Sequence, residues 1–170
     1  MKSFILVEDN VLDKKSCKNI IEKYKNITNI NLDHTGYKGF YINLNDKIFN
    51  EIQLKILKSI KKYVKLYPEI NLTKDKWALT ELTFKHFKPG NHFADWHSEV
   101  GKNCNTRILN LMIYLSDHNC GTEFFEKKYV IKSKIGRLTI FPSYFTHTHR
   151  GQVCPDNKDR YILGGYYNFV

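Results

Sequence analysis

The feature that most constrains the fold is a change of hydrophobic period at Trp77. From Trp77 onward, Ala78, Thr80, Leu82 and Phe84 alternate with the residues between them until Pro89 and Gly90 stop the pattern, and a period of two is typical of a β-strand. Similar short stretches follow at 107–115, 122–125, 129–133, 136–141 and 160–169, with polar turns between them. Short strands that recur about every ten residues indicate an antiparallel sandwich or barrel rather than alternating strands and helices.

Before Trp77 the sequence has a helical period. Asp13 is a suitable N-cap for a helix that ends near residue 26, and a second helix runs from Asp46 until Pro68 closes it. The apolar positions of the two helices are Cys17, Ile20, Ile21 and Tyr24, then Ile48, Ile52, Ile56, Ile60 and Val64. A helix with one apolar face must cover another surface, so we expect both helices to pack on one outer face of the β-core.

The segment between the helices, 29–45, is rich in turn-forming residues around a short strand at 40–42. We see no repeat, low-complexity tract or linker. At 170 residues the chain has the size of one domain. We expect a single domain over 1–170, with a helical N-terminal support at about 1–70 and the β-core at about 77–170.

The net charge and the cysteine spacing indicate which binding partners and which cellular compartment to expect. The net charge of +10 raises nucleic acid or acidic polymers as partners, but the lysines are spread over the predicted helices and turns, so we do not favour nucleic acid. The first nine residues are too short an apolar stretch for a signal peptide, and no apolar run suits a membrane partner. The four cysteines form no C-x-x-C pair, which favours reduced thiols and a cytoplasmic protein.

Reactive side chains concentrate in the β-half. His97 and Glu99 are two apart in an extended stretch, so both can face one ion, and His147 offers another imidazole beside a later strand end. Two histidines and one carboxylate form the ligand set of non-haem Fe(II) oxygenases. Taken alone, His97 also fits a half-buried strand histidine without any ligand. His149 competes with His147 for the metal, and it also fits a group beside the ligands or a solvated turn residue.

Two further positions suggest a carboxylate pocket. Arg160 opens an otherwise apolar strand, and its guanidinium is suited to hold a carboxylate bidentately; a strand-edge salt bridge would also explain it. Tyr114 ends the strand at 107–115 and could place a hydroxyl in the same barrel mouth, or it is simply a buried tyrosine bonded to the backbone. Arg107 fits either the substrate side of such a site or a surface ion pair.

Several segments follow one family pattern in order and with family-like spacing. They are FKPGNHFADWHSE at 87–99, Arg107 followed by Tyr114-Leu115-Ser116, GTEF at 121–124, GRLTIFP at 136–142, and His147 with Arg160. Together they resemble the prolyl hydroxylase-like branch of the 2-oxoglutarate/Fe(II)-dependent dioxygenases. The likeness covers about 77–170, and residues 4–24 resemble the first helix of that branch.

The resemblance implies a mainly β fold, a double-stranded β-helix (jelly-roll, cupin-like) core with the N-terminal helices on one sheet. It implies Fe(II) ligands His97, Glu99 and His147, and 2-oxoglutarate with its distal carboxylate on Arg160 and Tyr114. Thr122 would line that end of the pocket. The implied reaction is O2-dependent hydroxylation of an unactivated C–H bond, on a prolyl or similar residue of a peptide or protein, or on a small molecule such as a free amino acid. Ascorbate would be an optional reductant.

The chain departs from the family pattern at three places. Glu99 stands where aspartate is usual, with Asp95 as the fallback ligand. Phe87 replaces a tyrosine that often touches the C1 end of 2-oxoglutarate, so that hydrogen bond is absent. Cys120 replaces the first glycine of a pair, which is harmless unless the turn needs a positive φ.

Other functions stay open. A non-catalytic cupin-like module would bind metal or ligand without chemistry. A nucleic-acid-directed dioxygenase ranks lower, because Tyr166 stands where that branch carries a second arginine. A basic nucleic-acid binder would use the lysine-rich helices.

Overall fold

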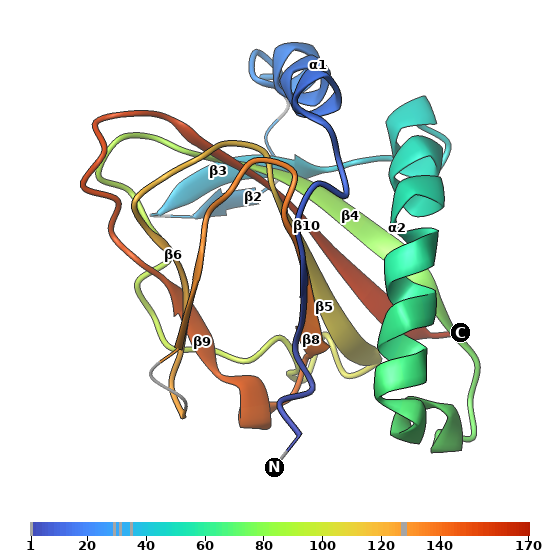
Figure 1. The fold of residues 1–170 in the computed structure, drawn as a ribbon. Coiled ribbons are helices and arrows are strands. Elements are labelled where there is room, and N and C mark those ends of the chain that lie inside the picture. Colours follow the sequence, from blue (N-terminus) through green and yellow to red (C-terminus); the bar gives the residue numbers. More distant parts are fainter. Residues whose placement is uncertain (1, 29, 31, 35, 127–128) are drawn as a thin grey trace.

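The computed structural model describes residues 2–28, 30, 32–34, 36–126 and 129–170. Its strands form two antiparallel sheets (Figure 1). In spatial order the large sheet contains β1 (Leu6–Glu8), β8 (Leu138–Pro142), β5 (Arg107–Tyr114), β10 (Arg160–Phe169), β4 (Trp77–Phe87), β3 (Tyr37–Tyr41) and β2 (Leu32–His34). The small sheet contains β7 (Tyr129–Lys132), β6 (Gly121–Phe124) and β9 (His149–Gly151).

The helices begin where the sequence predicts them. Helix α1 (Lys14–Tyr24) is capped by Asp13, whose carboxylate accepts from Ser16 N at 2.8 Å. Helix α2 (Lys47–Leu66) is capped in the same way by Asp46, which accepts from Ile48 N at 2.8 Å. Each cap satisfies an amide that has no partner inside the helix. After α2, Pro68 does not end all helical structure but opens a short 3-10 helix, η1 (Pro68–Leu72).

The large sheet has a core on each face. On the outer face α1 and α2 bury Cys17 and Ile56 completely, together with strand residues such as Leu111 and Leu163. The second core lies between the sheets and consists of Phe87, Tyr114, Phe124, Ile131, Phe141 and Ile162. Figure 1 shows both helices outside the sandwich, and the small sheet on the opposite side of the large one. The inner face of the large sheet is therefore left free to build a site.

The N-terminal part is less purely helical than expected. It adds β1 to one edge of the large sheet, where Leu6 pairs with Ile140, and it adds β3 and β2 to the other edge. The short strand predicted at 40–42 is present as β3, in which Phe40 pairs with Phe84. Among the described helices, none has the length and apolar composition needed to span a membrane.

The expectation of reduced thiols is wrong for one pair. Cys120 and Cys154 form a disulfide, with their Cα atoms 4.9 Å apart, whereas Cys17 and Cys104 are free. The two segments meet because β9 pairs with β6 and Gln152 N then donates to Gly121 O at 2.9 Å. Cys120 immediately precedes β6, and Cys154 lies in the connection from β9 to β10. Sequence spacing cannot show this, because the contact is made by strand pairing.

Candidate metal centre and carboxylate pocket

A pocket lies between the two sheets. Its floor comes from β4, β5 and β10 of the large sheet, and β6 and β9 of the small sheet line the other side. Arg160, Ile162 and Gly164 of β10 line it at every second position, so they share one face of the strand. Ile162 is paired with Tyr114 of β5 and Lys85 of β4, which brings both neighbouring strands to the same wall.

Three potential metal ligands meet at one end of the pocket. The carboxylate oxygen Glu99 Oε1 lies 3.6 Å from His97 Nε2 and 3.4 Å from His149 Nε2. One ligand atom from each residue falls within 4.8 Å of the others. Two imidazoles and one carboxylate on one side of an ion leave the other positions open, as in non-haem Fe(II) oxygenases.

Both imidazoles are oriented by the backbone. His97 Nδ1 lies 2.9 Å from Asp95 O, and His149 Nδ1 lies 2.9 Å from His147 O. A carbonyl oxygen only accepts, so each Nδ1 carries the proton and each Nε2 is left to face Glu99. Three electron-rich atoms at this separation need a cation or an added proton between them. The donor set therefore fits a divalent transition metal.

Glu99 is itself held in place. Asn110 Nδ2 donates to Oε1 at 3.0 Å and the Tyr166 hydroxyl donates to Oε2 at 2.8 Å. Burial alone would raise the pKa of Glu99, but the neighbouring His149 and His97 side chains and the charge of Lys85 hold it well below its usual range. The longer glutamate side chain thus reaches the two imidazoles as a fixed carboxylate. Asp95, the fallback ligand, is exposed and contributes only its backbone carbonyl.

The prediction that His147 is the third ligand is corrected here. His147 Nε2 lies 2.9 Å from Ser3 O and its Nδ1 lies 3.0 Å from Thr146 Oγ1, so the ring faces the N-terminal segment. The reason is that η2 (Phe145–His147) is a turn of 3-10 helix and not a strand. The strand resumes only at His149, which pairs with Phe124 of β6 and forms a bridge with His97.

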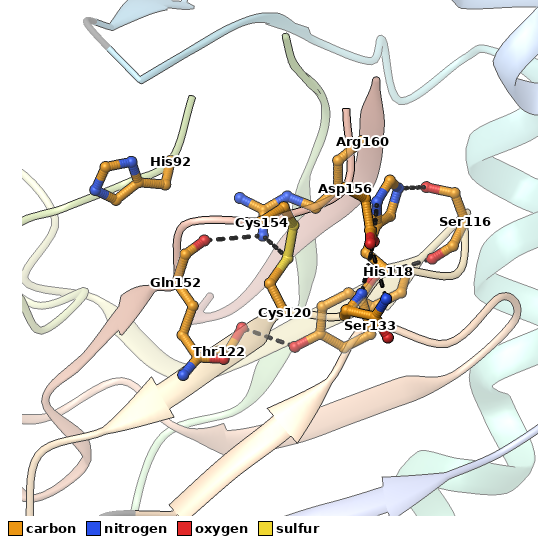
Figure 2. The surroundings of a disulfide bond; sticks show 12 residues. His92, Ser116, His118, Cys120, Thr122, Ser133, Gln152, Cys154, Asp156 and Arg160 are labelled. Carbon is orange, nitrogen blue, oxygen red and sulfur yellow. Dashed lines mark hydrogen bonds and ion pairs between the residues drawn. A yellow bond between two sulfur atoms is a disulfide. The ribbon is translucent and has the colours of Figure 1, made fainter. Parts of the chain in front are cut away.

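Arg160 occupies the other end of the pocket. It is 3% exposed, and Figure 2 shows its guanidinium beside the disulfide. Nη1 donates to Cys120 Sγ at 3.1 Å and to Gln152 O at 3.5 Å, while the buried Nε has no partner in the described residues. The alternative of a strand-edge salt bridge to an acidic residue is not made within that part of the chain. Burial lowers the pKa of Arg160, and an anionic ligand would offset this cost.

Tyr114 and Thr122 lie near Arg160, as the sequence predicted. Their hydroxyl oxygens are 2.7 Å apart, and both side chains are buried (Figure 2 shows Thr122 with this contact). Burial raises the pKa of Tyr114 to about 12, so the phenol keeps its proton. The guanidinium, the phenol and the threonine hydroxyl together offer donors suited to a carboxylate.

Arg107 is neither a surface group nor free. Its Nη2 donates to Glu81 Oε2 at 2.6 Å, and its guanidinium lies 3.6 Å from the centre of the Tyr166 ring. Nη1 is 3.8 Å from Glu99 Oε2. Arg107 therefore supports the residues that hold Glu99. Neither this role nor those of Asn110 and Tyr166 could be predicted from the sequence, because all three depend on contacts between distant strands.

Comparisons with known proteins agree with this architecture. Neither a protein-family model nor a curated protein matches the sequence. Among solved structures, a viral collagen prolyl hydroxylase from Paramecium Bursaria Chlorella virus-1, in its 2-oxoglutarate complex, has a TM-score of 0.75 at 18% identity, over 99% of this chain and 97% of that chain. HygX from Streptomyces hygroscopicus, with nickel and 2-oxoglutarate bound, has a TM-score of 0.74 at 8% identity, over 98% and 83%.

A third structure carries a peptide. It is a prolyl hydroxylase from Trichoplax adhaerens in complex with a hypoxia inducible factor peptide fragment, with a TM-score of 0.69 at 13% identity, over 99% of this chain and 84% of that chain. At these identities the likeness shows the fold. The predicted jelly-roll core with helices on one sheet is confirmed.

Proposed function

We propose that this chain is an Fe(II)- and 2-oxoglutarate-dependent oxygenase that hydroxylates a prolyl or similar residue of a peptide or protein. The observation that carries the proposal is the pairing of two sites in one pocket. His97, Glu99 and His149 form a ligand set with open positions, and Arg160 is a buried cation without an acidic partner in the described residues. A metal-storage or scaffold module has no need of a carboxylate site beside its metal.

The residues divide the work between the two ends of the pocket. His97, Glu99 and His149 would hold the iron, and Arg160 with Tyr114 would hold the distal carboxylate of 2-oxoglutarate. When bound, these groups supply the oxidising chemistry, in which O2 and 2-oxoglutarate yield succinate, CO2 and a hydroxylated C–H bond. The protein orients the reactants, neutralises their charge and excludes water.

The chain also fixes the metal ligands before anything binds. The carbonyls of Asp95 and His147 set the imidazole rings, and the Tyr166 hydroxyl and the Asn110 amide set the Glu99 carboxylate. Such preorganisation removes the cost of ordering ligands on binding.

The peptide substrate is supported by likeness. Two of the similar structures are prolyl hydroxylases, and one of these holds a peptide. We therefore infer that the substrate is a polypeptide and not nucleic acid.

The test is a turnover assay with the purified protein, Fe(II), O2 and 2-oxoglutarate. Proline-containing peptides, free amino acids and methylated oligonucleotides are offered as substrates. The expected result is succinate release with one oxygen atom gained by a prolyl peptide, and no turnover by His97→Ala. Succinate without any modified peptide would keep the oxygenase and refute the prolyl substrate. An absence of succinate with every substrate would refute the enzyme.

A further inference from the structure

The pocket contains a second cationic side chain, which belongs neither to the three potential metal ligands nor to the Arg160 end. Lys85 lies on β4, two residues before Phe87, and its side chain lines the pocket. In the described part of the chain no acidic group lies within salt-bridge distance of its ammonium. The contact that the structure does show is with Tyr37, whose ring centre is 5.1 Å from Lys85 Nζ. Removing a lysine ammonium from water in this way costs free energy unless an anion binds beside it.

The Lys85 ammonium lies over a glycine of the neighbouring strand. A Cβ atom placed on Gly164 would lie 3.4 Å from both Lys85 Nζ and Lys85 Cε, so the lysine extends over that residue. Gly164 lies on β10 four residues after Arg160, about 13 Å along the strand, and two residues before Tyr166. Because Tyr166 holds Glu99, Lys85 Nζ is displaced from the Arg160 end toward the metal ligands.

The electrostatics agree with this placement. Glu99 raises the pKa of Lys85 against the lowering effect of burial, and Lys85 in turn lowers the pKa of Glu99. The two groups therefore interact across the pocket without a direct salt bridge in the described residues. With a divalent metal in place, the metal, Lys85 and Arg160 would stand against the single carboxylate of Glu99. A dianion would offset most of this excess positive charge.

We propose that Lys85 binds the carboxylate at the metal end of 2-oxoglutarate, so that the cofactor is held by a cation at each end. This inference rests on the proposed function. Lys85 would replace the hydrogen bond to the C1 end of 2-oxoglutarate that Phe87 cannot make, because the lysine two residues earlier projects from the same face of β4. Lys85 is thus a cofactor-binding residue, and Tyr37 and Gly164 provide its place.

The test measures binding to protein loaded with Mn(II), by titration calorimetry, so that no turnover is needed. The variants are Lys85→Met, Arg160→Met and, as a matched control, Lys88→Met, which changes an exposed lysine beyond the end of the same strand. The ligands are 2-oxoglutarate and 2-oxobutyrate, a 2-oxo acid that lacks the distal carboxylate.

Lys85→Met should weaken both ligands by a similar factor of about 10 to 100, the worth of a hydrogen bond to a charged group. Arg160→Met should weaken 2-oxoglutarate alone, and Lys88→Met should weaken neither. Without any 2-oxo acid, Lys85→Met should bind Mn(II) more tightly, by roughly threefold or more, because a like charge has been removed. A purely structural role for Lys85 would not raise metal affinity.

The outcomes separate the two proposals. If wild-type protein binds Mn(II) but not 2-oxoglutarate, the proposed function fails. If the wild type binds 2-oxoglutarate and Lys85→Met binds it equally well, only the role of Lys85 is overturned. If Lys85→Met weakens 2-oxoglutarate but not 2-oxobutyrate, Lys85 serves the distal carboxylate and the proposal is wrong.

Discussion

His97 and His149 donate backbone hydrogen bonds to each other, from N to O at 3.0 and 2.9 Å, although four strands of sequence lie between them. This bridge attaches the long connection between β4 and β5 to the small sheet. It also sets the two imidazole rings with their centres 4.4 Å apart on the same side as Glu99. The candidate metal centre is thus built by strand-like pairing and not by a local sequence motif.

The two neighbouring histidines give a matched pair of variants. His149→Ala should weaken Mn(II) or Fe(II) binding by roughly 100-fold or more, because it removes a ligand from a set of three. His147→Ala should retain metal affinity and lose about 1 kcal/mol of unfolding free energy, since it removes the contact with Ser3 O. Calorimetric metal titration and thermal unfolding of both variants check this. Loss of metal binding in His147→Ala with retention in His149→Ala would reverse our assignment.

Arg160 should matter to the dicarboxylate and not to the metal. Arg160→Met is expected to weaken 2-oxoglutarate binding by about 10- to 100-fold, because a charge-assisted bidentate contact is lost. The 2-oxoglutarate affinity of Arg160→Lys should lie between those of the wild type and Arg160→Met, because lysine keeps the charge but not the planar guanidinium. Titration of the Mn(II)-loaded proteins measures both. Equal 2-oxoglutarate affinity in all three would show that the guanidinium does not face the ligand.

The disulfide should stabilise the loop that carries the Arg160 end. Cys120 and Cys154 are 34 residues apart, and a loop of this length is worth about 3 to 4 kcal/mol in the chain-entropy account. Cys154→Ser should therefore lower the melting temperature by several degrees, whereas the control Cys104→Ser, at a free cysteine, should not. Reduction of the wild type with a dithiol should reproduce the effect. Identical melting temperatures for the two variants would exclude a stabilising bond.

The ion pairs of Asp9, the residue that follows β1, predict that the stability of the protein depends on pH. Asp9 accepts from Arg137 Nε at 2.7 Å and from Lys134 Nζ at 2.7 Å, which lowers the pKa of Asp9 from 3.8 to about 2. A carboxyl whose pKa is lower in the folded state stabilises that state above the unfolded value. Its contribution is lost as the pH falls through the folded value.

Asp9→Asn should therefore lower the free energy of unfolding above pH 4, and the difference should vanish as the pH falls below about 2. The cost should not exceed about 1 kcal/mol, because the pair is partly exposed. Urea unfolding of wild type and variant at several pH values measures it. A difference that does not change with pH would contradict the role of the charge.

Much of the fold was predictable because its long elements carry strong periodicity. Both helices have apolar positions at helical spacing and an aspartate cap, and β4 and β10 are long enough to show alternation. The three-residue strands β1, β2 and β9 were not predicted, because three residues show no period. They exist through pairing with β8, β3 and β6, which is decided by tertiary structure.

Site residues were predictable from the sequence where they lie in extended segments of the chain. His97 and Glu99 were predicted to act together and do lie together. Arg160 and Thr122 line the other end of the same pocket, and Tyr114 contacts Thr122. His147 was preferred over His149 because it lies five residues after Pro142, the distance in the family that the sequence resembles, but the 3-10 turn at Phe145–His147 leaves His149 to join the other two ligands. The spacing of a single chain cannot reveal such a turn.

Other features depend on contacts between distant segments. The partnership of Glu99 with Tyr166 and Asn110, the disulfide, and the position of Lys85 arise from strands that are adjacent only in the folded sheet. Lys85 reads in the sequence as one more polar residue on an alternating strand. Its half-buried place in the pocket wall comes from the pairing of β4 with β10.

The proposed function requires that one pocket holds both a metal and a chelating 2-oxo acid. Its most direct test is the visible absorption spectrum of the anaerobic protein with Fe(II) and 2-oxoglutarate. We expect a weak charge-transfer band in the wild type and in His147→Ala, and no band in His97→Ala or His149→Ala. A spectrum of the wild type that is unchanged by 2-oxoglutarate, under conditions where Fe(II) is bound, would contradict it.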